Sequence, residues 1–336
     1  MKNISIVIPA YNSQASVGRL LRSIFNSRNV DFRGFEVIVV DDKSTDKTVK
    51  EAKKFKVRII SLNKNSGPAK ARNIGVKYSK GKIVLFLDDD VVLFRNTLFE
   101  VVNSFKNDPD LFALTGVWTK EQRSRKFFPK FKALRDWSYW INERDPRNYY
   151  YLFSTRVAAI DRKLFLRLGG FDTTYKAALI EDIELTYRIA RRYAVVFNPN
   201  VRVSHEFETF LPIAQKYFWR SYYWSKLYRK RKKFDPVATT SKEAMTTLSA
   251  GLLVILVFIF LLGRIMNQEL RIMNISVSFL LLNSIFLILF IHLWGVRKFL
   301  IFAAKEEGVL FAVKSFFTGL VLYLIILSGA FFALVK

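Results

Sequence analysis

Three long apolar runs in the C-terminal third restrict what this chain can fold into. They extend from Ala244 to Gly263, from Ile272 to Trp294, and from Val309 to Val335, the last interrupted by Lys314. A helix needs about 20 residues to cross a hydrocarbon core of about 30 Å. Buried core helices are the alternative, but successive runs of this length with short polar links are typical of membrane spans. We therefore predict a transmembrane domain over residues 244–336.

The cations beside these runs predict which way the chain is inserted. They are dense before the first run and recur in both links: Arg229, Lys230, Arg231, Lys232, Lys233, Lys242, Arg264, Arg271, Arg297, Lys298 and Lys305. Cytoplasmic segments carry the excess of Lys and Arg, so we expect residues 1–243 in the cytosol. The short stretch from Ile4 to Ala10 includes polar Ser5 and is typical of a strand rather than of a signal peptide. The sequence predicts a multi-pass protein of the cell membrane.

Residues 209–243, directly before the first apolar run, mix aromatic rings with cations. The rings belong to Tyr217, Phe218, Trp219, Tyr222, Tyr223, Trp224 and Tyr228, with Lys216, Arg220 and Lys226 among them. Aromatic rings suit the headgroup level of a bilayer, and cations suit anionic lipids. Stacking on nucleic-acid bases is the alternative. The neighbouring span favours an amphipathic membrane-interface segment on anionic headgroups, with no nucleic acid as partner.

The composition excludes several kinds of chemistry. The chain has 336 residues, 54 Lys plus Arg against 28 Asp plus Glu, and no Cys. Without Cys there are no disulfides, thiolate metal sites or Cys nucleophiles. The formal charge of +26 attracts polyanions, whether nucleic acid, anionic headgroups or nucleotide phosphates. Any metal must be held by oxygen and nitrogen ligands.

Residues 1–118 alternate strand and helix patterns. Between the predicted strands, Val17, Leu20, Leu21, Ile24 and Phe25 form the stripe of a surface helix. Another helix is predicted to open at Gly67-Pro68, because Pro suits a first helical position. The strands are expected at Ile4–Pro9, Phe35–Val40, Val57–Ser61, Lys82–Leu87 and Leu111–Trp118. This alternation predicts an α/β open sheet.

Carboxylates follow two of these strands. Asp41 and Asp42 come after the second strand, and Asp88, Asp89 and Asp90 come after the fourth. Ligands of open α/β sheets bind beyond the C-terminal strand ends, where a divalent cation would relieve the repulsion among the carboxylates. Capping of the following helices explains some of these residues but not three in succession. Neither a Gly-x-Gly-x-x-Gly motif nor a Walker loop is present, so any nucleotide phosphates are expected to be held mainly through a metal.

Several motifs together are similar to those of one enzyme family. They are Ser5 to Asn12, Val37 to Asp46, Gly67 with Ala71 to Gly75, Leu87 to Asp90, Gly169 to Asp172, and Glu181 to Leu185 with Arg188. Each is weak alone, but their order and spacing resemble the family 2 glycosyltransferases of glycosyltransferase-A fold. The resemblance covers most of residues 1–208. It implies a catalytic domain with a Rossmann-like open mixed sheet over these residues.

The resemblance implies a nucleotide-sugar donor and a metal. Pro9 and Tyr11 match the floor of the nucleoside site, and Asp42 matches the carboxylate that accepts a base N–H from uracil or guanine. Asp89 is also expected to bind the nucleotide. Asp88 and Asp90 match the Asp-x-Asp pair, through which Mg²⁺ or Mn²⁺ would bridge protein and donor diphosphate. The donor is therefore expected to be a UDP- or GDP-sugar.

The general base implied by the resemblance is Asp182, the position at which inverting members deprotonate an acceptor hydroxyl. Helix capping and pairing with Arg188 are its structural alternatives, and Glu181 is the competing base. A lipid-phosphate acceptor would need no base, because its oxygen is already ionised. His205 matches a position that some members use near the metal, although a structural role in a loop is as common for a lone His.

The departures from the family concern the acceptor. The Gln-x-x-Arg-Trp motif of polysaccharide synthases is absent from residues 209–243, so we expect transfer of a single sugar. Residues 120–151 match no family motif. They are expected to form a basic and aromatic insert on the acceptor side, a solvated basic surface being the alternative.

These inferences predict an inverting hexosyltransferase that acts on a lipid-phosphate or lipid-linked acceptor at the cytosolic face. A catalytically inactive basic protein that binds anionic lipid or nucleic acid is the alternative. A transporter is disfavoured because Lys314 is the one clear charge within the runs. Small residues such as Gly319 and Ser328 would permit a homo-oligomer.

Overall fold

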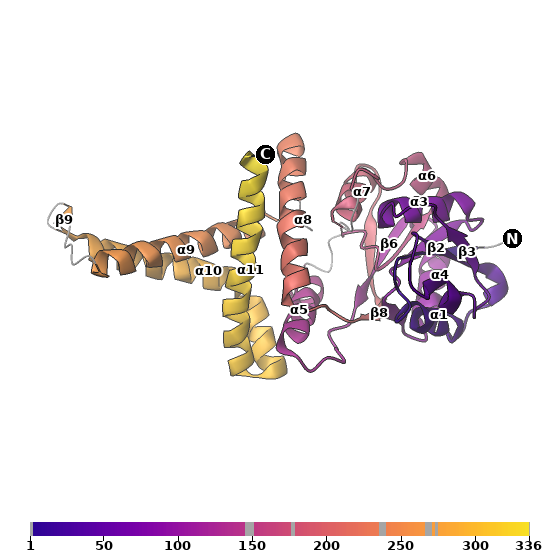
Figure 1. The fold of residues 1–336 in the computed structure, drawn as a ribbon, viewed down its shortest axis with the longest axis horizontal. Helices are drawn as coiled ribbons and strands as arrows, with labels where there is room; N and C mark the ends of the chain where they lie inside the picture. The colour runs from indigo at the N-terminus through magenta and orange to yellow at the C-terminus, as the bar shows by residue number, and fades with distance from the viewer. Residues whose placement is uncertain are drawn as a thin grey trace. The chain divides into compact units, whose positions relative to one another are not determined.

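The computed structural model describes residues 3–144, 151–175, 179–234, 240–265, 271–272 and 275–335. The chain forms two compact units, Met1–Phe207 and Glu208–Lys336. The N-terminal unit is built on a mixed sheet covered by helices (Figure 1). Where the structure describes it, the C-terminal unit is helical apart from one very short strand pair.

The sheet of the N-terminal unit has eight strands in the order β3-β2-β1-β4-β7-β6-β8-β5. β1, β2, β3 and β4 are parallel neighbours, whereas β7 is antiparallel to both β4 and β6, and β5 is antiparallel to β8. The mixed open sheet predicted from the sequence is thus confirmed. The strands are β1 (Ile4–Ala10), β2 (Phe35–Asp41), β3 (Arg58–Ser61), β4 (Ile83–Leu87), β5 (Val91–Leu93), β6 (Ala113–Trp118), β7 (Val157–Asp161) and β8 (Val195–His205).

The helices of this unit follow the predicted apolar patterns. α1 (Val17–Phe25) buries Val17, Leu20, Leu21 and Ile24, as its stripe predicts. α3 starts at Pro68, directly after Gly67, whose φ of 87° is readily accessible only to glycine. The remaining helices are α2 (Thr48–Ala52), α4 (Thr97–Asn107), α5 (Phe127–Trp137), α6 (Arg162–Arg167) and α7 (Glu181–Ile189).

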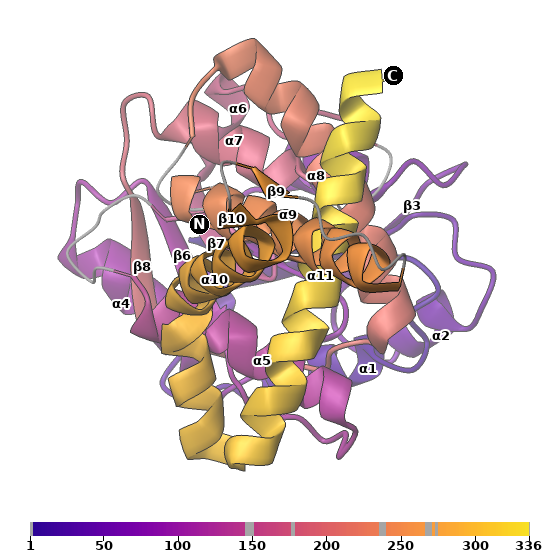
Figure 2. The ribbon, with the colours of Figure 1, turned by 90° about the vertical axis from the view of Figure 1, so that its left-hand side faces the viewer.

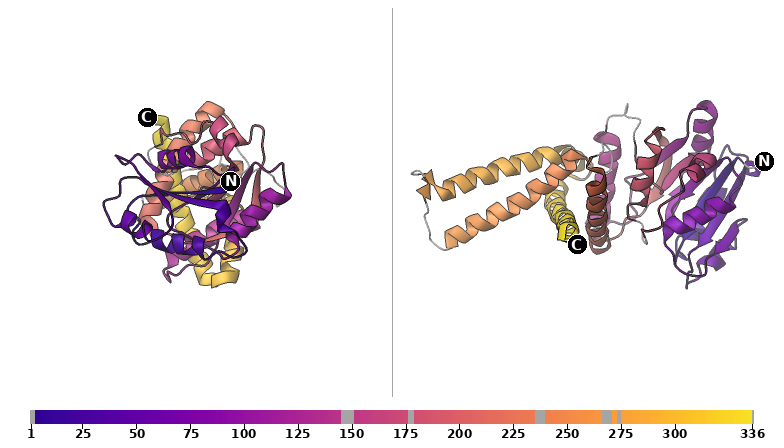
Figure 3. Two further views of the ribbon diagram at one scale, coloured as in Figure 1. Left: turned by 90° about the vertical axis from the view of Figure 1, so that its right-hand side faces the viewer. Right: turned by 90° about the horizontal axis from the view of Figure 1, so that it is seen from above.

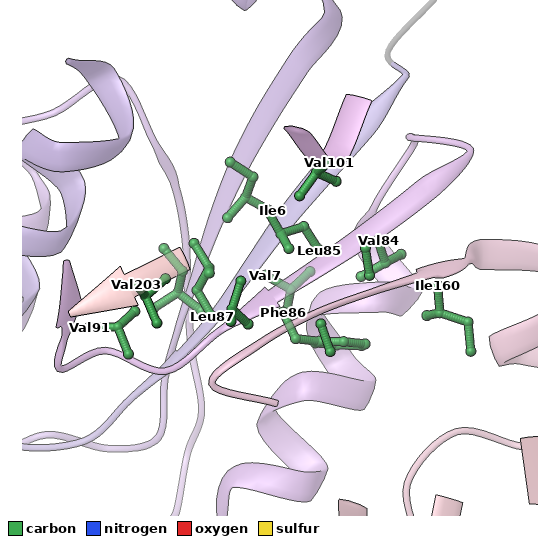
Figure 4. Packing of buried hydrophobic residues seen from close by; sticks show 14 of the residues in the cluster. Ile6, Val7, Val84, Leu85, Phe86, Leu87, Val91, Val101, Ile160 and Val203 are labelled. Carbon is green, nitrogen blue, oxygen red and sulfur yellow. The ribbon is translucent and has the colours of Figure 1, made fainter. Parts of the chain in front are cut away.

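The core lies on both faces of the central strands. β1 and β4 are buried along nearly their whole length, as expected for parallel strands covered on both faces. Figure 4 shows side chains of β1, β4, β5 and β8 gathered in one cluster. α3 approaches the sheet closely at Gly75, where a Cβ would lie 2.4 Å from Cγ1 of Val7. This packing fixes the strand ends at which the predicted site residues lie.

The predicted insert 120–151 contributes to this core. α5 buries Phe131 and Leu134, and Trp140 is 5% exposed with its ring 5.5 Å from that of Trp118. Lys132 of α5 is also buried and pairs with Asp136. The described part of the segment, up to residue 144, is therefore more than a solvated basic surface.

The C-terminal unit consists of four long helices: α8 (Phe210–Arg231), α9 (Ser241–Ile265), α10 (Val277–Glu307) and α11 (Val309–Val335). By length and composition α9, α10 and α11 are each able to cross a membrane. α10 begins at Val277 rather than at the predicted Ile272 and continues past Trp294 to Glu307. The short strands β9 (Arg271–Ile272) and β10 (Ile275–Ser276) pair before it, which explains the later start.

Candidate active site

The predicted site residues meet at one edge of the sheet. The backbone N–H of Asp42 donates to the carbonyl of Ala10 at 2.8 Å, which joins the ends of β2 and β1. The backbone N–H of Tyr11 donates to the Asp89 carboxylate at 3.3 Å, and the Ser13 hydroxyl donates to the same oxygen. The ends of β1, β2 and β4 therefore come together, as the rule for open α/β sheets predicts.

Pro9 and Tyr11 lie in different environments at this edge. Pro9 is buried within β1 opposite Val40 of β2. Tyr11, just beyond the strand, has a side chain that is 48% exposed. An exposed ring beside the strand ends suits contact with a nucleoside, but the binding roles of both residues remain predictions.

Asp42 holds the turn that precedes α3. One carboxylate oxygen accepts the backbone N–H of Ser66 at 2.8 Å, and the other accepts that of Gly67 at 2.7 Å. Asp42 is 3% exposed. Each oxygen retains a further lone pair, so a base N–H is a chemically acceptable additional donor. Its predicted role in base recognition stays a prediction, and the structure adds a structural role.

Arg72 of α3 joins two carboxylates that lie far apart in the sequence. Its guanidinium donates to Asp88 at 2.6 Å and to Glu181 at 3.1 Å. Arg72 is 2% exposed, so burial alone would lower its pKa, but the negative charges of Asp88, Glu181 and Asp182 raise the pKa of Arg72. The guanidinium is a fixed positive charge between the Asp-x-Asp segment and the start of α7.

The two acids at the start of α7 differ in their surroundings. Glu181 is 2% exposed and also accepts the backbone N–H of Leu179 at 2.9 Å. Asp182 is half-buried, and one of its oxygens lies 2.8 Å from the N–H of Ile183. Arg188 forms an ion pair with Glu184 at 2.5 Å. The sequence had suggested Asp182 as its partner. Of the two candidate bases, Asp182 is the more accessible.

His205 and Asp90 are brought together by strand pairing. Val91 of β5 is opposite His205 at the end of β8, and Nε2 of His205 lies 3.2 Å from a carboxylate oxygen of Asp90. His205 is 7% exposed, and its buried Nδ1 has no hydrogen-bond partner among the described residues. The side-chain amide of Gln122 donates to the His205 carbonyl at 2.8 Å and accepts the Phe207 N–H at 2.8 Å. This clamp fixes the end of β8.

The acidic loop, Asp88 to Asp90, carries three successive carboxylates. Burial raises the pKa of Asp89 to about 7, the hydrogen bond from Ser13 opposes this shift, and the charges of Asp90 and Asp88 add to it. Among the described residues, no group of three or more His, Asp or Glu side chains is arranged to hold a metal ion. Asp90 and His205 form an oxygen and nitrogen pair, which fits a cation that takes its other ligands from a substrate diphosphate and water.

Several residues that build this site were not predicted from the sequence. Ser13 binds Asp89, and Asn73 both donates to the Phe171 carbonyl at 2.8 Å and accepts its N–H at 2.9 Å. A Cβ at Gly170 would lie 2.6 Å from Oδ1 of Asn73, which explains a glycine there. Arg72 and Asn73 lie within the motif from Ala71 to Gly75, so the sequence could have indicated them as site residues. No sequence pattern indicates Gln122.

Comparisons with known proteins agree with this architecture. The model of the family described as Glycosyl transferase family 2 matches residues 5–171. An uncharacterized glycosyltransferase of Haemophilus influenzae is 28% identical over 192 residues, which cover 55% of this chain and 61% of the relative. The poly(ribitol-phosphate) beta-N-acetylglucosaminyltransferase TarP of Staphylococcus aureus is 38% identical over 131 residues, which cover 37% of this chain and 39% of TarP. The matches thus span less than two thirds of either relative.

Among solved structures, the mannosyltransferase PcManGT from Pyrobaculum calidifontis, in complex with GDP-Man and Mn²⁺, has a TM-score of 0.58 at 18% sequence identity. The alignment covers 99% of this chain and 87% of PcManGT. The N-terminal unit therefore has the glycosyltransferase-A fold. More specifically, the chain carries a glycosyltransferase family 2 domain, followed by three long apolar helices.

Proposed function

We propose that this protein is a membrane-bound, metal-dependent inverting glycosyltransferase that transfers a single hexose from a UDP- or GDP-sugar. The acceptor is a lipid phosphate or a lipid-linked saccharide at the cytosolic membrane face. One observation carries the proposal: Arg72 connects Asp88 of the acidic loop to Glu181, which directly precedes Asp182. This bridge links the donor side and the acceptor side of one site.

On the donor side, Pro9 and Tyr11 contact the nucleoside, and Asp42 and Asp89 bind it through hydrogen bonds. Asp90 and His205, with Asp88 beside them, would hold Mg²⁺ or Mn²⁺. When bound, such a cation would supply positive charge to neutralise the leaving nucleoside diphosphate. The Mn²⁺ and GDP-Man in the PcManGT complex and the contact of 3.2 Å between His205 and Asp90 support this assignment.

On the acceptor side, Asp182 accepts the proton of the attacking hydroxyl. The acceptor oxygen forms a bond to the anomeric carbon while the bond from that carbon to the diphosphate oxygen breaks, on the opposite face, so the configuration inverts. Glu181 is unsuited to this role because its carboxylate is buried against Arg72. With a phosphate acceptor the attacking oxygen carries no proton, and Asp182 orients it instead.

The C-terminal unit supports a membrane acceptor. The apolar helices α9, α10 and α11 anchor the enzyme, and α8 carries six cations and no acidic residue. Anchoring raises the effective concentration of a lipid-borne acceptor at the site. The name of TarP refers to poly(ribitol-phosphate), so a phosphate-containing polymer is the acceptor to compare with lipid.

The test incubates membranes containing the full chain with labelled UDP- and GDP-hexoses, each with and without Mn²⁺. We expect metal-dependent label in a solvent-extractable lipid. Asp90→Ala should reduce transfer by a factor of about 10² or more, and Asp182→Asn should do the same when the acceptor is a hydroxyl, whereas Asp110→Ala, a change at an exposed surface acid, should not. Label found only in polymer would overturn the lipid acceptor. No transfer from any donor, with membrane attachment intact, would favour the inactive binding protein.

A further inference from the structure

The apolar helix α11 packs beside a helix that is unsuited to crossing a bilayer. α8 and α11 run side by side in Figures 1 and 3. Their approach is close at Gly329 of α11, where a Cβ would lie 2.2 Å from Oγ of Ser221. The ring of Phe332 lies 5.8 Å from that of Phe218 and 5.6 Å from that of Tyr222. The two helices therefore share one depth relative to any membrane.

α8 restricts what that depth can be. Its 22 residues include Lys216, Arg220, Lys226, Arg229, Lys230 and Arg231 and no acidic residue. Charged side chains within a bilayer are costly and rarely face lipid, whereas the same mixture of rings and cations suits the headgroup level. Arg229 of α8 donates to the carbonyl of Ala333, near the end of α11. The C-terminal end of α11 therefore lies beside the basic end of α8.

The positions of the buried residues along α9 and α10 indicate where α11 packs against them. In α9 the buried residues lie between Thr246 and Leu253, and in α10 between His292 and Ala303, whereas in α11 they extend from Ala312 to Ala333. α11 thus covers only this part of the α9 and α10 pair, residues 246–253 and 292–303, which we call the base of the pair. Figures 1 and 2 show the same arrangement, with α11 crosswise to the pair and the last turns of α10 beside its first turns.

The base and the far end of this pair differ in chemistry. At the base, Nδ1 of His292 lies 3.0 Å from Oγ of Ser249 and 3.2 Å from the carbonyl of Thr246. His292 is 1% exposed within this polar contact. Away from the base, large apolar side chains are exposed, among them Phe258 at 64%, Phe286 at 61% and Leu287 at 60%. Such a surface fits acyl chains.

α11 also has a lipid-compatible face opposite its packed face. Its exposed large apolar residues Leu310, Val313, Phe317, Val321, Phe331 and Leu334 recur at helical spacing along the whole helix. The buried residues Ala312, Ser315, Gly319, Leu322, Gly329 and Ala333 follow the same spacing, offset by two positions. An offset of two positions puts the two stripes on opposite sides of a helix.

We infer that only α9 and α10 cross the membrane, and that α11 lies with α8 in the plane of one leaflet, with its exposed apolar stripe on the acyl chains. The surface that α11 presents is thus a site for the lipid bilayer rather than a third span. The C-terminus then lies on the same side as the N-terminal unit, whereas three spans would put it on the opposite side.

The absence of Cys from the chain makes this consequence directly testable. Single cysteines are introduced as Lys53→Cys on the exposed surface of the N-terminal unit, as Arg264→Cys at the exposed end of α9, and after Lys336 on a short Gly/Ser linker. Each full-length variant is labelled in sealed vesicles with a membrane-impermeant maleimide, and labelling in detergent gives the total. The linker carries the last cysteine clear of the bilayer.

We expect the C-terminal cysteine to be labelled from the same side as Lys53→Cys, with Arg264→Cys labelled from the opposite side. Labelling of the C-terminal cysteine from the Arg264→Cys side would overturn the inference. A green fluorescent protein fused after Lys336 gives an independent measurement in intact cells, because it fluoresces efficiently when left in the cytosol. Fluorescence comparable to that of a fusion truncated after Glu307 supports the in-plane helix, and its loss contradicts it.

Discussion

The two halves of the N-terminal unit are held together in different ways. In the half that we propose to bind the donor, residues 3–93 (the donor half), acidic side chains mostly accept backbone N–H groups of adjacent loops. Asp41 accepts that of Ser44 at 3.1 Å, and Asp46 accepts that of Gln14 at 3.0 Å. Asp42 binds the turn at Ser66 and Gly67 in the same way. Many separate contacts of one kind therefore fix the donor loops.

The half that carries the proposed base, residues 97–207 (the acceptor half), depends on a few contacts that are distant in the sequence. Arg72 reaches Glu181, Asn73 reaches Phe171, and Gln122 reaches His205. Two of these three contacts start from α3 of the donor half. The donor loops are therefore fixed by contacts within their own half, whereas the position of Asp182 depends on side chains of the other half. Substitutions on α3 should therefore disturb the acceptor side most.

The largest expected effect is that of Arg72→Met, which leaves Glu181 buried without its cation. Breaking a buried ion pair costs about 3–5 kcal/mol, and we expect a loss of this size in the free energy of unfolding of the full chain in detergent. Arg58→Met, the same change at an exposed position, is the control. Adding Glu181→Gln to Arg72→Met should recover part of the loss. A loss below about 1 kcal/mol for Arg72→Met would contradict the bridge.

Asp42→Ala should damage the donor half selectively. It removes the acceptor of the buried Gly67 N–H and of the part-buried Ser66 N–H, at a cost of about 2–3 kcal/mol, and should weaken binding of UDP or GDP. Hydrogen exchange should accelerate at Ser66 and Gly67 but not at Phe171. Faster exchange in both halves would mean that the donor half is not fixed locally. Titration calorimetry with each nucleotide measures the change in affinity.

Asn73→Ala should have a smaller effect that is confined to the acceptor half. It removes both hydrogen bonds to the backbone of Phe171 and should cost about 1–2 kcal/mol. The amide of Phe171 should exchange faster, while Ser66 and Gly67 stay protected. Asn73→Asp keeps the acceptor for the Phe171 N–H but loses the donor, so it should give intermediate protection. Equal protection in all three forms would rule out this clamp.

The smallest expected effect is that of Glu51→Gln on the donor surface. Glu51 pairs with Lys54 at 2.6 Å, and the Lys54 side chain is 58% exposed. Exposed pairs of this kind contribute about 0–1 kcal/mol, so thermal unfolding should hardly change. A loss of stability as large as that of Arg72→Met would show that burial does not explain the difference in strength between the Arg72–Glu181 and Lys54–Glu51 pairs.

Most of the sheet could be predicted from the sequence because its strands are short apolar runs between turn residues. β1, β2, β3, β4 and β6 lie within two residues of their predicted starts and ends. β7 was not predicted, and its antiparallel insertion between β4 and β6 depends on contacts that no local pattern contains. Likewise α10 continues past Trp294, because residues 295–303 pack on α11 rather than forming a polar link.

The candidate site could be predicted only in part. Motif positions led to Asp42, Asp89, Asp90, Asp182 and His205, which the fold brings to one edge of the sheet or close to it. The bridge by Arg72 requires knowing that residues 88 and 181 flank one guanidinium, and this is a property of the folded chain. The sequence also did not decide whether Asp182 or Glu181 is the better candidate for the base. Their unequal burial now distinguishes them.

The position of β8 has a consequence for how the protein is made. β8 lies between β6 and β5, and β5 has no other neighbour in the sheet. During translation, which delivers the N-terminal segments first, β5 emerges long before the strand that pairs with it. The contact between Asp90 and His205 must then be one of the last to form in this unit, shortly before the ribosome releases α8 and the first apolar helix. The contact between β5 and β8 therefore forms only when the last residues of the N-terminal unit are available.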